Sequence, residues 1–176
     1  EGLRQPIPAG PGSGWGWHVR EFVENNAAVW SCPSKPGPRT WPQLNTGIPT
    51  RMVDYAAAEY RWNVHGPIAH GMRGVPITSL TRGTTQTVLL GEKRINVVQA
   101  AVWSAADDDF GQFAGADWDV MRTCTLPPLP DCHEGNGDSR FGASHGDQFP
   151  VAMCDGSVQW MRYDVDPVLW SQMGRR

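Results

Sequence analysis

The most regular alternation of apolar and polar residues lies near the carboxyl end of the chain. Two runs, FPVAMC and SVQWMRYD, flank the dipeptide Asp155-Gly156 and alternate with a period of two. This period is typical of β-strands, and it places Val151 and Met153 on one face of the first strand. Asp-Gly between two strands favours a two-residue type I′ turn, in which both residues have positive φ. The pattern therefore predicts a β-hairpin over residues 149–164.

Helical patterns lie at both ends of the chain. In DPVLWSQMGRR, Asp164 or Asp166 can cap a helix that has Pro167 at its first position. Near the amino end, four apolar residues share one helical face. These are Trp15, Val19, Phe22 and Val23. The sequence thus predicts a short terminal helix and a short amphipathic helix over residues 15–28.

The middle of the chain consists of short apolar runs separated by loops. The run TQTVLLGEKR predicts a strand, and ITSLTRGTTQ predicts one helical turn that Gly83 closes. The run MVDYAAAEYRWN is ambiguous from its residues alone, because its alanines favour a helix. Residues 64–76 and 124–140 have the composition of loops. Together the patterns predict a single α+β domain over residues 1–176, with an antiparallel sheet, short helices and long ordered loops.

Composition narrows the class of protein. Fifteen prolines and twenty glycines in 176 residues exceed the usual share, which agrees with many turns and few long helices. The formal net charge is −3 without a basic stripe, so the chain is not expected to bind nucleic acid. No stretch reaches the roughly 18 apolar residues of a membrane span, and the first residues do not resemble a signal peptide.

Four cysteines allow three disulfide pairings. Cys124 and Cys132 bracket the proline-rich loop TLPPLPD, and we expect them to form a disulfide, which implies an oxidising compartment. The alternative is four buried free thiols. None of the cysteines has the C-x-x-C spacing of a zinc or redox site.

An acidic segment is the candidate metal site. Carboxylate-rich loops suit Ca²⁺, which takes six to eight oxygen ligands in a loose geometry. The candidate ligands are Asp107, Asp108, Asp109, Asp117 and Asp119. No EF-hand spacing is present, and solvated surface charge is the alternative interpretation. The sequence therefore implies no cofactor other than this candidate Ca²⁺.

His145 and Asp155 are ten residues apart, with one predicted strand between them. An extended strand of that length separates its ends by on the order of 20 Å, which argues against a catalytic dyad. We expect Asp155-Gly156 to form the turn and His145 to hydrogen-bond a neighbouring loop, both in structural roles. Ser144 lies beside His145, but neighbours on a strand face opposite ways. No nucleophile elbow, H-E-x-x-H or phosphate loop is present, so we expect no enzyme activity.

Two further residue types have open interpretations. Glu92, inside an apolar run, is expected to be an interior carboxylate that pairs with an arginine or lysine. The nine tryptophans could stack on sugar rings, although in a small domain they more often fill the core.

Five segments, taken in order, resemble one known family. They are GWGWHVREFVENNAAVWSCPS, DYAAAEY, ITSLTRGTTQTVLLGEKR, the ending FGASHGDQFPVAMCDGSVQWMRYDVDPVLWSQMG, and within it His145, nine residues and Asp155-Gly156. The last pattern resembles the H-X9-DG signature of a prepilin-type family found chiefly in planctomycetes, the domain of unknown function 1559, sometimes labelled solute-binding-like. The resemblance implies that DYAAAEY is a strand.

The resemblance also implies a pseudopilin-like, extracytoplasmic protein. Relatives begin with a leader and an apolar membrane helix, both of which we expect this chain to lack. In those relatives a cysteine of the helix is an alternative to Cys154 as the disulfide partner of Cys32. The implied function is a non-enzymatic structural or interaction protein of a surface filament, secretion apparatus or envelope complex. Its partners would be proteins or further copies, and only the absent helix would contact the membrane. The alternative is a carbohydrate- or solute-binding module, with Ca²⁺ as a possible aid; a hydrolase using His145 is the weakest alternative.

Overall fold

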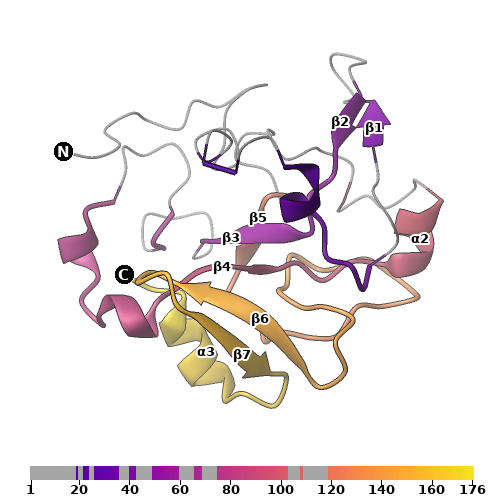
Figure 1. Ribbon diagram of the computed structural model, residues 1–176. Helices are drawn as coiled ribbons and strands as arrows, with labels where there is room; N and C mark the ends of the chain where they lie inside the picture. Colours follow the sequence, from indigo (N-terminus) through magenta and orange to yellow (C-terminus); the bar gives the residue numbers. More distant parts are fainter. Residues whose placement is uncertain are drawn as a thin grey trace.

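The computed structural model describes residues 19, 22–23, 26–35, 40–42, 49–59, 66–68, 75–102, 108 and 119–176 (Figure 1). The main sheet has five strands in the order β5-β3-β4-β6-β7. They are β3 (Tyr55–Glu59), β4 (Val88–Glu92), β5 (Met121–Thr123), β6 (Gln148–Met153) and β7 (Val158–Arg162). The α+β fold class predicted from the sequence is confirmed.

Shorter elements surround this sheet. Strands β1 (Thr40–Pro42) and β2 (Pro49–Arg51) form a separate antiparallel pair. Among the described residues, α2 (Val97–Ala101) and α3 (Pro167–Met173) are α-helices, and single 3-10 turns occupy Ala27–Trp30, Ile77–Ser79 and Thr84–Gln86. The predicted helix over residues 15–28 lies mostly outside the described residues. Within the described part of the chain, no helix combines the length and the apolar content that a membrane span requires.

The sheet is mixed, whereas the sequence predicted an antiparallel one. β3 pairs with β4, β4 with β6 and β6 with β7 in the antiparallel sense, but β3 pairs with β5 in the parallel sense. The alanine run 56–58 forms the centre of β3, where each alanine is fully buried. A small side chain fits between two covered faces, and this tertiary packing outweighs the helical preference of alanine.

The two faces of the sheet pack against different parts of the chain. On one face, Ala56 and Ala58 belong to a core cluster with Phe149 of β6 and Trp170 of α3. On the other face, Ala57 lies in a second cluster with Trp30. This alternation follows from the period of two in a strand. Figure 1 shows α3 beside β6 and β7, while the 3-10 turn that contains Trp30 lies beyond β3.

The predicted hairpin is confirmed, but its turn differs from the prediction. Gly156 has positive φ, at +87°, and Asp155 does not. The Met153 amide donates to the Ser157 carbonyl (2.8 Å), so the loop has three residues and ends in a left-handed glycine. The Asp155 carboxylate accepts hydrogen bonds from the Ser157 amide (2.9 Å) and hydroxyl (2.7 Å). These bonds stabilise Asp155 at negative φ, which excludes a type I′ turn.

The start of α3 agrees with the sequence prediction. The Asp166 side chain accepts hydrogen bonds from the amides of Val168 (2.9 Å) and Leu169 (2.8 Å), and Pro167 occupies the first helical position. Two amides that have no partner within the helix are thereby satisfied.

We expect Gly142→Ala to destabilise the protein by about 1–3 kcal/mol, as overpacking of a tight interior does. An added Cβ at this position would lie 1.8 Å from the backbone oxygen of Leu129. The two segments are held together by a hydrogen bond from the Leu129 amide to the Phe141 carbonyl (3.1 Å), so one of them must move. Urea unfolding followed by circular dichroism measures the loss.

Gly135→Ala is the matched control for this substitution. Gly135 has φ of +71° and nothing within 4 Å of an added Cβ, so an alanine there meets no neighbouring atom and costs only the strain of a left-handed backbone. If Gly142→Ala were no more destabilising than Gly135→Ala, the close approach of the Leu129 backbone would not govern this position.

Candidate functional site

Three polar side chains from distant parts of the sequence meet on the face of the sheet that Trp30 covers. Cys32 follows the 3-10 turn Ala27–Trp30, Glu92 ends β4, and His145 precedes β6. His145 Nε2 lies 3.3 Å from Cys32 Sγ and 3.0 Å from Glu92 Oε1. We call Cys32, Glu92 and His145 the polar trio.

The backbone around the polar trio is held by hydrogen bonds to Asp54. The Cys32 amide donates to Asp54 Oδ2 (2.8 Å), and the Asp54 amide donates to the Trp30 carbonyl (2.9 Å). The Lys93 amide donates to the Asp54 carbonyl (2.9 Å), which fixes the residue next to Glu92. Asp54 therefore links the segment that carries Cys32 to the end of β4.

His145 is positioned by an aromatic neighbour. Its ring meets that of Trp160 edge to face, with centroids 5.6 Å apart. Trp160 belongs to β7 and lies opposite Pro150 of β6 in the sheet register. The β6–β7 hairpin thus supports the histidine ring. The His145 side chain is 21% exposed to solvent.

Burial dominates the electrostatics of the trio. Glu92 is only 2% exposed, and this burial raises the pKa of its carboxyl above the usual value, although the Lys35 charge and the bond to His145 oppose the shift. Burial likewise raises the pKa of the Cys32 thiol. Glu92 Oε2 is buried and has no hydrogen-bond partner among the described residues. A buried carboxylate oxygen that accepts no hydrogen bond lowers the stability of the folded protein, so this atom calls for a structural explanation.

Lys35 is a cation whose charge acts on Glu92. Its Nζ donates to the Lys93 carbonyl and lies 3.8 Å from Asp131 Oδ1. Asp131 also accepts hydrogen bonds from the Ile95 amide (2.8 Å) and from Ser144 Oγ (2.7 Å). The Ser144 hydroxyl is therefore hydrogen-bonded to Asp131.

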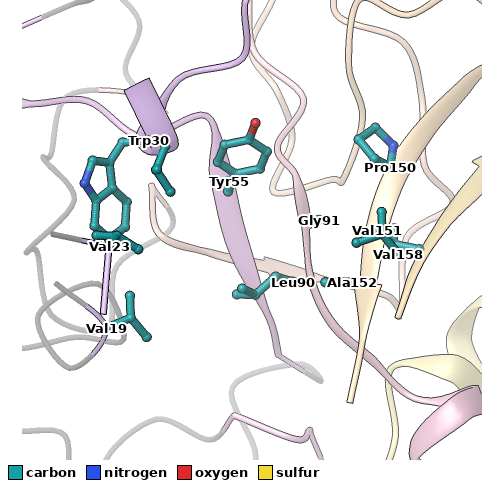
Figure 2. Close-up of a pocket in the computed structure, with 11 residues that line it drawn as sticks. Val19, Val23, Trp30, Tyr55, Leu90, Gly91, Pro150, Val151, Ala152 and Val158 are labelled. Atoms are coloured by element: carbon teal, nitrogen blue, oxygen red, sulfur yellow. The ribbon is translucent and has the colours of Figure 1, made fainter. Parts of the chain in front are cut away.

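An apolar hollow of about 380 Å³ lies on the same face of the sheet. Figure 2 shows Val19, Val23 and Trp30 on one side and residues of β4, β6 and β7 on the other. Tyr55 connects the hollow to the polar trio, because it lines the hollow and pairs with Glu92 across the sheet. The hollow and the trio are neighbouring parts of one surface.

The trio does not have the arrangement of a nucleophile, base and acid relay. In such a relay the nucleophile and the acid contact different nitrogens of the histidine ring. Here Cys32 and Glu92 both contact Nε2. The three donor atoms lie within 4.8 Å of one another, which is an arrangement that can surround a cation.

The structure gives His145 and Asp155 separate partners. His145 contacts Cys32, Glu92 and Trp160, whereas Asp155 bonds Ser157 at the hairpin turn. The hydrogen bonds from Ser157 lower the pKa of the Asp155 carboxyl. His145 thus contacts Cys32 in a neighbouring loop, as the sequence suggested, and in addition Glu92 at the end of β4.

The acidic candidates for Ca²⁺ are only partly described. Asp107, Asp109 and Asp117 lie outside the described residues. Asp108 is buried with its Oδ1 2.7 Å from Lys93 Nζ, and the buried Asp119 offers its carbonyl to the same ammonium (2.8 Å). Lys93 thus contacts both of these residues, and a Ca²⁺ site at the acidic segment stays a prediction.

The structure does not contain the predicted Cys124–Cys132 disulfide. All four cysteines, each within the described residues, are free. Cys124 is fully buried in the cluster with Trp170, and its side chain fills the space beside Gly174. Cys132 instead directs its sulfur toward the carbonyls of Ile95 (3.6 Å) and Asn136 (3.5 Å). The two thiols therefore have different surroundings and are not joined.

Sequence reasoning identified one member of the trio as a buried charge and missed the cluster. Glu92 was expected to be an interior carboxylate that pairs with an arginine or lysine; it is buried, its hydrogen-bond partner is His145, and the Lys35 charge acts on its carboxyl. Cys32 and His145 are too far apart in sequence for a short spacing motif to indicate that they lie together. Such a cluster becomes visible only when the register of the sheet is known.

Some of the described tryptophans fill the core and one is exposed on the surface. Trp30 and Trp170 are buried and fill the two core clusters, whereas Trp160 is 56% exposed. The other tryptophan side chains lie outside the described residues.

One comparison with known proteins gives a match. The family model SBP_bac_10, described as a protein of unknown function (DUF1559), matches residues 4–168. No curated protein and no solved structure matches the chain.

Proposed function

Since the chain belongs to the DUF1559 family of proteins of unknown function, we propose that it is a non-enzymatic, pilin-like head domain that acts outside the cytoplasm by binding an apolar helix. The helix would come from a neighbouring subunit of a surface filament, secretion apparatus or envelope complex. Pilin-like proteins assemble through apolar helices, as the resemblance described above implies. The domain needs no cofactor for this role.

The observation that carries this proposal is the apolar hollow. Val19 and Val23 are spaced four residues apart and form one wall, and Leu90, Ala152 and Val158 form part of the opposite surface (Figure 2). A row of aliphatic side chains on a helix has a matching apolar character. Burial of this surface would be favourable at about 25 cal/mol per Å² of apolar area.

The lining of the hollow argues against a sugar as its occupant. Among the lining residues, Trp30 and Tyr55 provide the polar side-chain atoms, and the others are aliphatic residues, proline or glycine. Sugar hydroxyls that enter such a surface lose hydrogen bonds to water without replacing them. The hollow therefore favours an apolar protein segment over the carbohydrate-binding alternative.

We expect the purified chain to bind a fluorescently labelled amphipathic helical peptide with one leucine and valine face, and Val158→Asp to weaken this binding at least tenfold. Val158 is exposed and lines the hollow, so an aspartate there places a charge against the apolar face of the peptide. Fluorescence anisotropy measures the dissociation constant, and circular dichroism confirms that the variant is folded.

Val168→Asp is the matched control. Val168 is similarly exposed, but it lies on α3, which packs on the opposite face of the sheet. Equal losses in the two variants, or no binding to the original chain, would contradict the role of the hollow.

The extracytoplasmic location has its own test. Codons upstream of Glu1 in the gene are expected to encode a prepilin leader and an apolar helix. A cytosolic domain encoded directly before Glu1 would contradict this part of the proposal.

A further inference from the structure

We infer that Cys32, Glu92 and His145 form a binding site for one divalent transition-metal ion, and that Zn²⁺ is the ion they fit best. Their donor atoms are a thiol sulfur, a carboxylate oxygen and an imidazole nitrogen. These three types of ligand are the ones that zinc takes in proteins. Magnesium and calcium prefer all-oxygen sites, so the sulfur and the nitrogen exclude them here.

The distances agree with a shared ion. Tetrahedral zinc, with Zn–S of about 2.3 Å and Zn–N or Zn–O of about 2.0–2.1 Å, places neighbouring donor atoms roughly 3.3–3.6 Å apart. The sulfur lies 3.3 Å and the Glu92 Oε1 lies 3.0 Å from His145 Nε2. A displacement of a few tenths of an ångström would bring each of these two contacts to the tetrahedral spacing, and all three donor atoms already lie within 4.8 Å of one another. The sulfur and the carboxylate oxygen therefore both lie near the positions, relative to the histidine nitrogen, that a shared ion needs.

A second observation points to the same ligand. Glu92 Oε2 is buried and lacks a hydrogen-bond partner among the described residues, so this carboxylate is not fully satisfied by protein groups. Cys32 and Glu92 both contact Nε2, and one ring nitrogen cannot donate its single proton fully to both. A cation between the three atoms would satisfy the carboxylate and remove this competition.

The surroundings hold the ligands in place. Asp54 accepts the Cys32 amide and fixes the residue that bears the sulfur, and Trp160 supports the histidine ring. Outer groups of this kind orient metal ligands and affect metal affinity. The nearby Lys35 charge is directed at the Lys93 carbonyl and at Asp131.

The site leaves room for a fourth ligand. Three protein ligands with one position for water are typical of zinc sites that are accessible from solvent. The His145 side chain is 21% exposed, so solvent reaches the trio from this side. The bound ion would connect the segment after Trp30, the end of β4 and the entry to β6.

The experiment uses the full chain, freed of metal with a chelator and kept reduced with a phosphine. Co²⁺ serves as the probe, because a cobalt–thiolate bond gives a charge-transfer absorption that reports on the cysteine. We expect one Co²⁺ per chain with this absorption, loss of the absorption when Zn²⁺ is added, and a higher Tm with Zn²⁺ that EDTA reverses.

Cys32→Ser is expected to abolish the charge-transfer absorption and to weaken Zn²⁺ binding at least tenfold. Cys132→Ser is the matched control, since Cys132 is also a free thiol but lies outside the trio at a partly exposed position, and it should keep both properties. His145→Ala provides a second variant at a partly exposed position, with the same expected loss of affinity, if Cys32→Ser fails to fold.

Two results would overturn the inference. One is the absence of stoichiometric Co²⁺ or Zn²⁺ binding by the folded, reduced chain, which would leave the trio as a hydrogen-bonded cluster. The other is binding that survives both Cys32→Ser and His145→Ala, which would assign the metal to other residues.

Discussion

Replacement of Trp170 by alanine is expected to lower the free energy of unfolding by about 3–5 kcal/mol. Trp170 is fully buried, and its ring meets Phe141 and Phe149 edge to face with centroids 5.7 Å and 5.8 Å apart. Its Nε1 also donates to the Leu126 carbonyl (2.9 Å). Alanine removes the apolar contacts, opens a cavity and leaves that carbonyl without its donor.

Urea unfolding monitored by far-ultraviolet circular dichroism measures this loss. The matched control is Leu169→Ala, the preceding residue of the same helix, whose side chain is largely exposed. It should change stability by less than about 1 kcal/mol, because it empties no buried space. Similar losses for the two variants would show that α3 does not anchor the core through Trp170.

The second large effect is expected for Lys93→Met, which should cost about 3–5 kcal/mol. The Lys93 side chain is fully buried, with its Nζ 2.7 Å from Asp108 Oδ1 and 2.8 Å from the Asp119 carbonyl. Methionine conserves most of the volume but removes the charge. The buried carboxylate of Asp108 then loses the ammonium that faces it, and removing one partner of a buried ion pair is costly.

A double substitution separates the charge effect from packing. If the buried carboxylate causes the loss, Lys93→Met with Asp108→Asn should be more stable than Lys93→Met alone, and the double-mutant cycle should show coupling of 0.5–3 kcal/mol, roughly the range for contacting residues. Arg162→Met is the surface control. Arg162 forms its ion pairs with Asp147 and Asp164 in solvent, and no measurable loss is expected there. A Lys93→Met protein as stable as this control would contradict the prediction.

Local signals in the sequence predicted the carboxyl-terminal part of the fold well. The cap by Asp166, Pro167 at the first helical position and the hairpin around Asp155-Gly156 each depend on residues that are close in sequence. Such features follow from backbone geometry and side-chain hydrogen bonds over a few residues. The type of the turn was wrong, because the Ser157 side chain contributes to it and the dipeptide rule does not include that residue.

Contacts between distant segments could not be predicted in the same way. Strand β5 has only three residues, too few for an alternating pattern, so neither the strand nor its parallel pairing with β3 was expected. The disulfide prediction used the spacing of Cys124 and Cys132, but burial of Cys124 beside Gly174 determines where its sulfur lies. The polar trio requires three segments to be correctly placed at once. Each of these features depends on tertiary packing, which no short window of sequence contains.

The parallel pairing of β3 with β5 has a consequence for the folding kinetics. The hairpin of β6 and β7 joins residues that are close in sequence, and such hairpins form within about 1–10 μs. Ala57 instead pairs with Met121, so the chain must close a long loop before this contact stabilises it. Contacts of long sequence separation slow folding. The edge of the sheet at β5 is therefore expected to form late, after the hairpin and α3 have already produced the core on the opposite face.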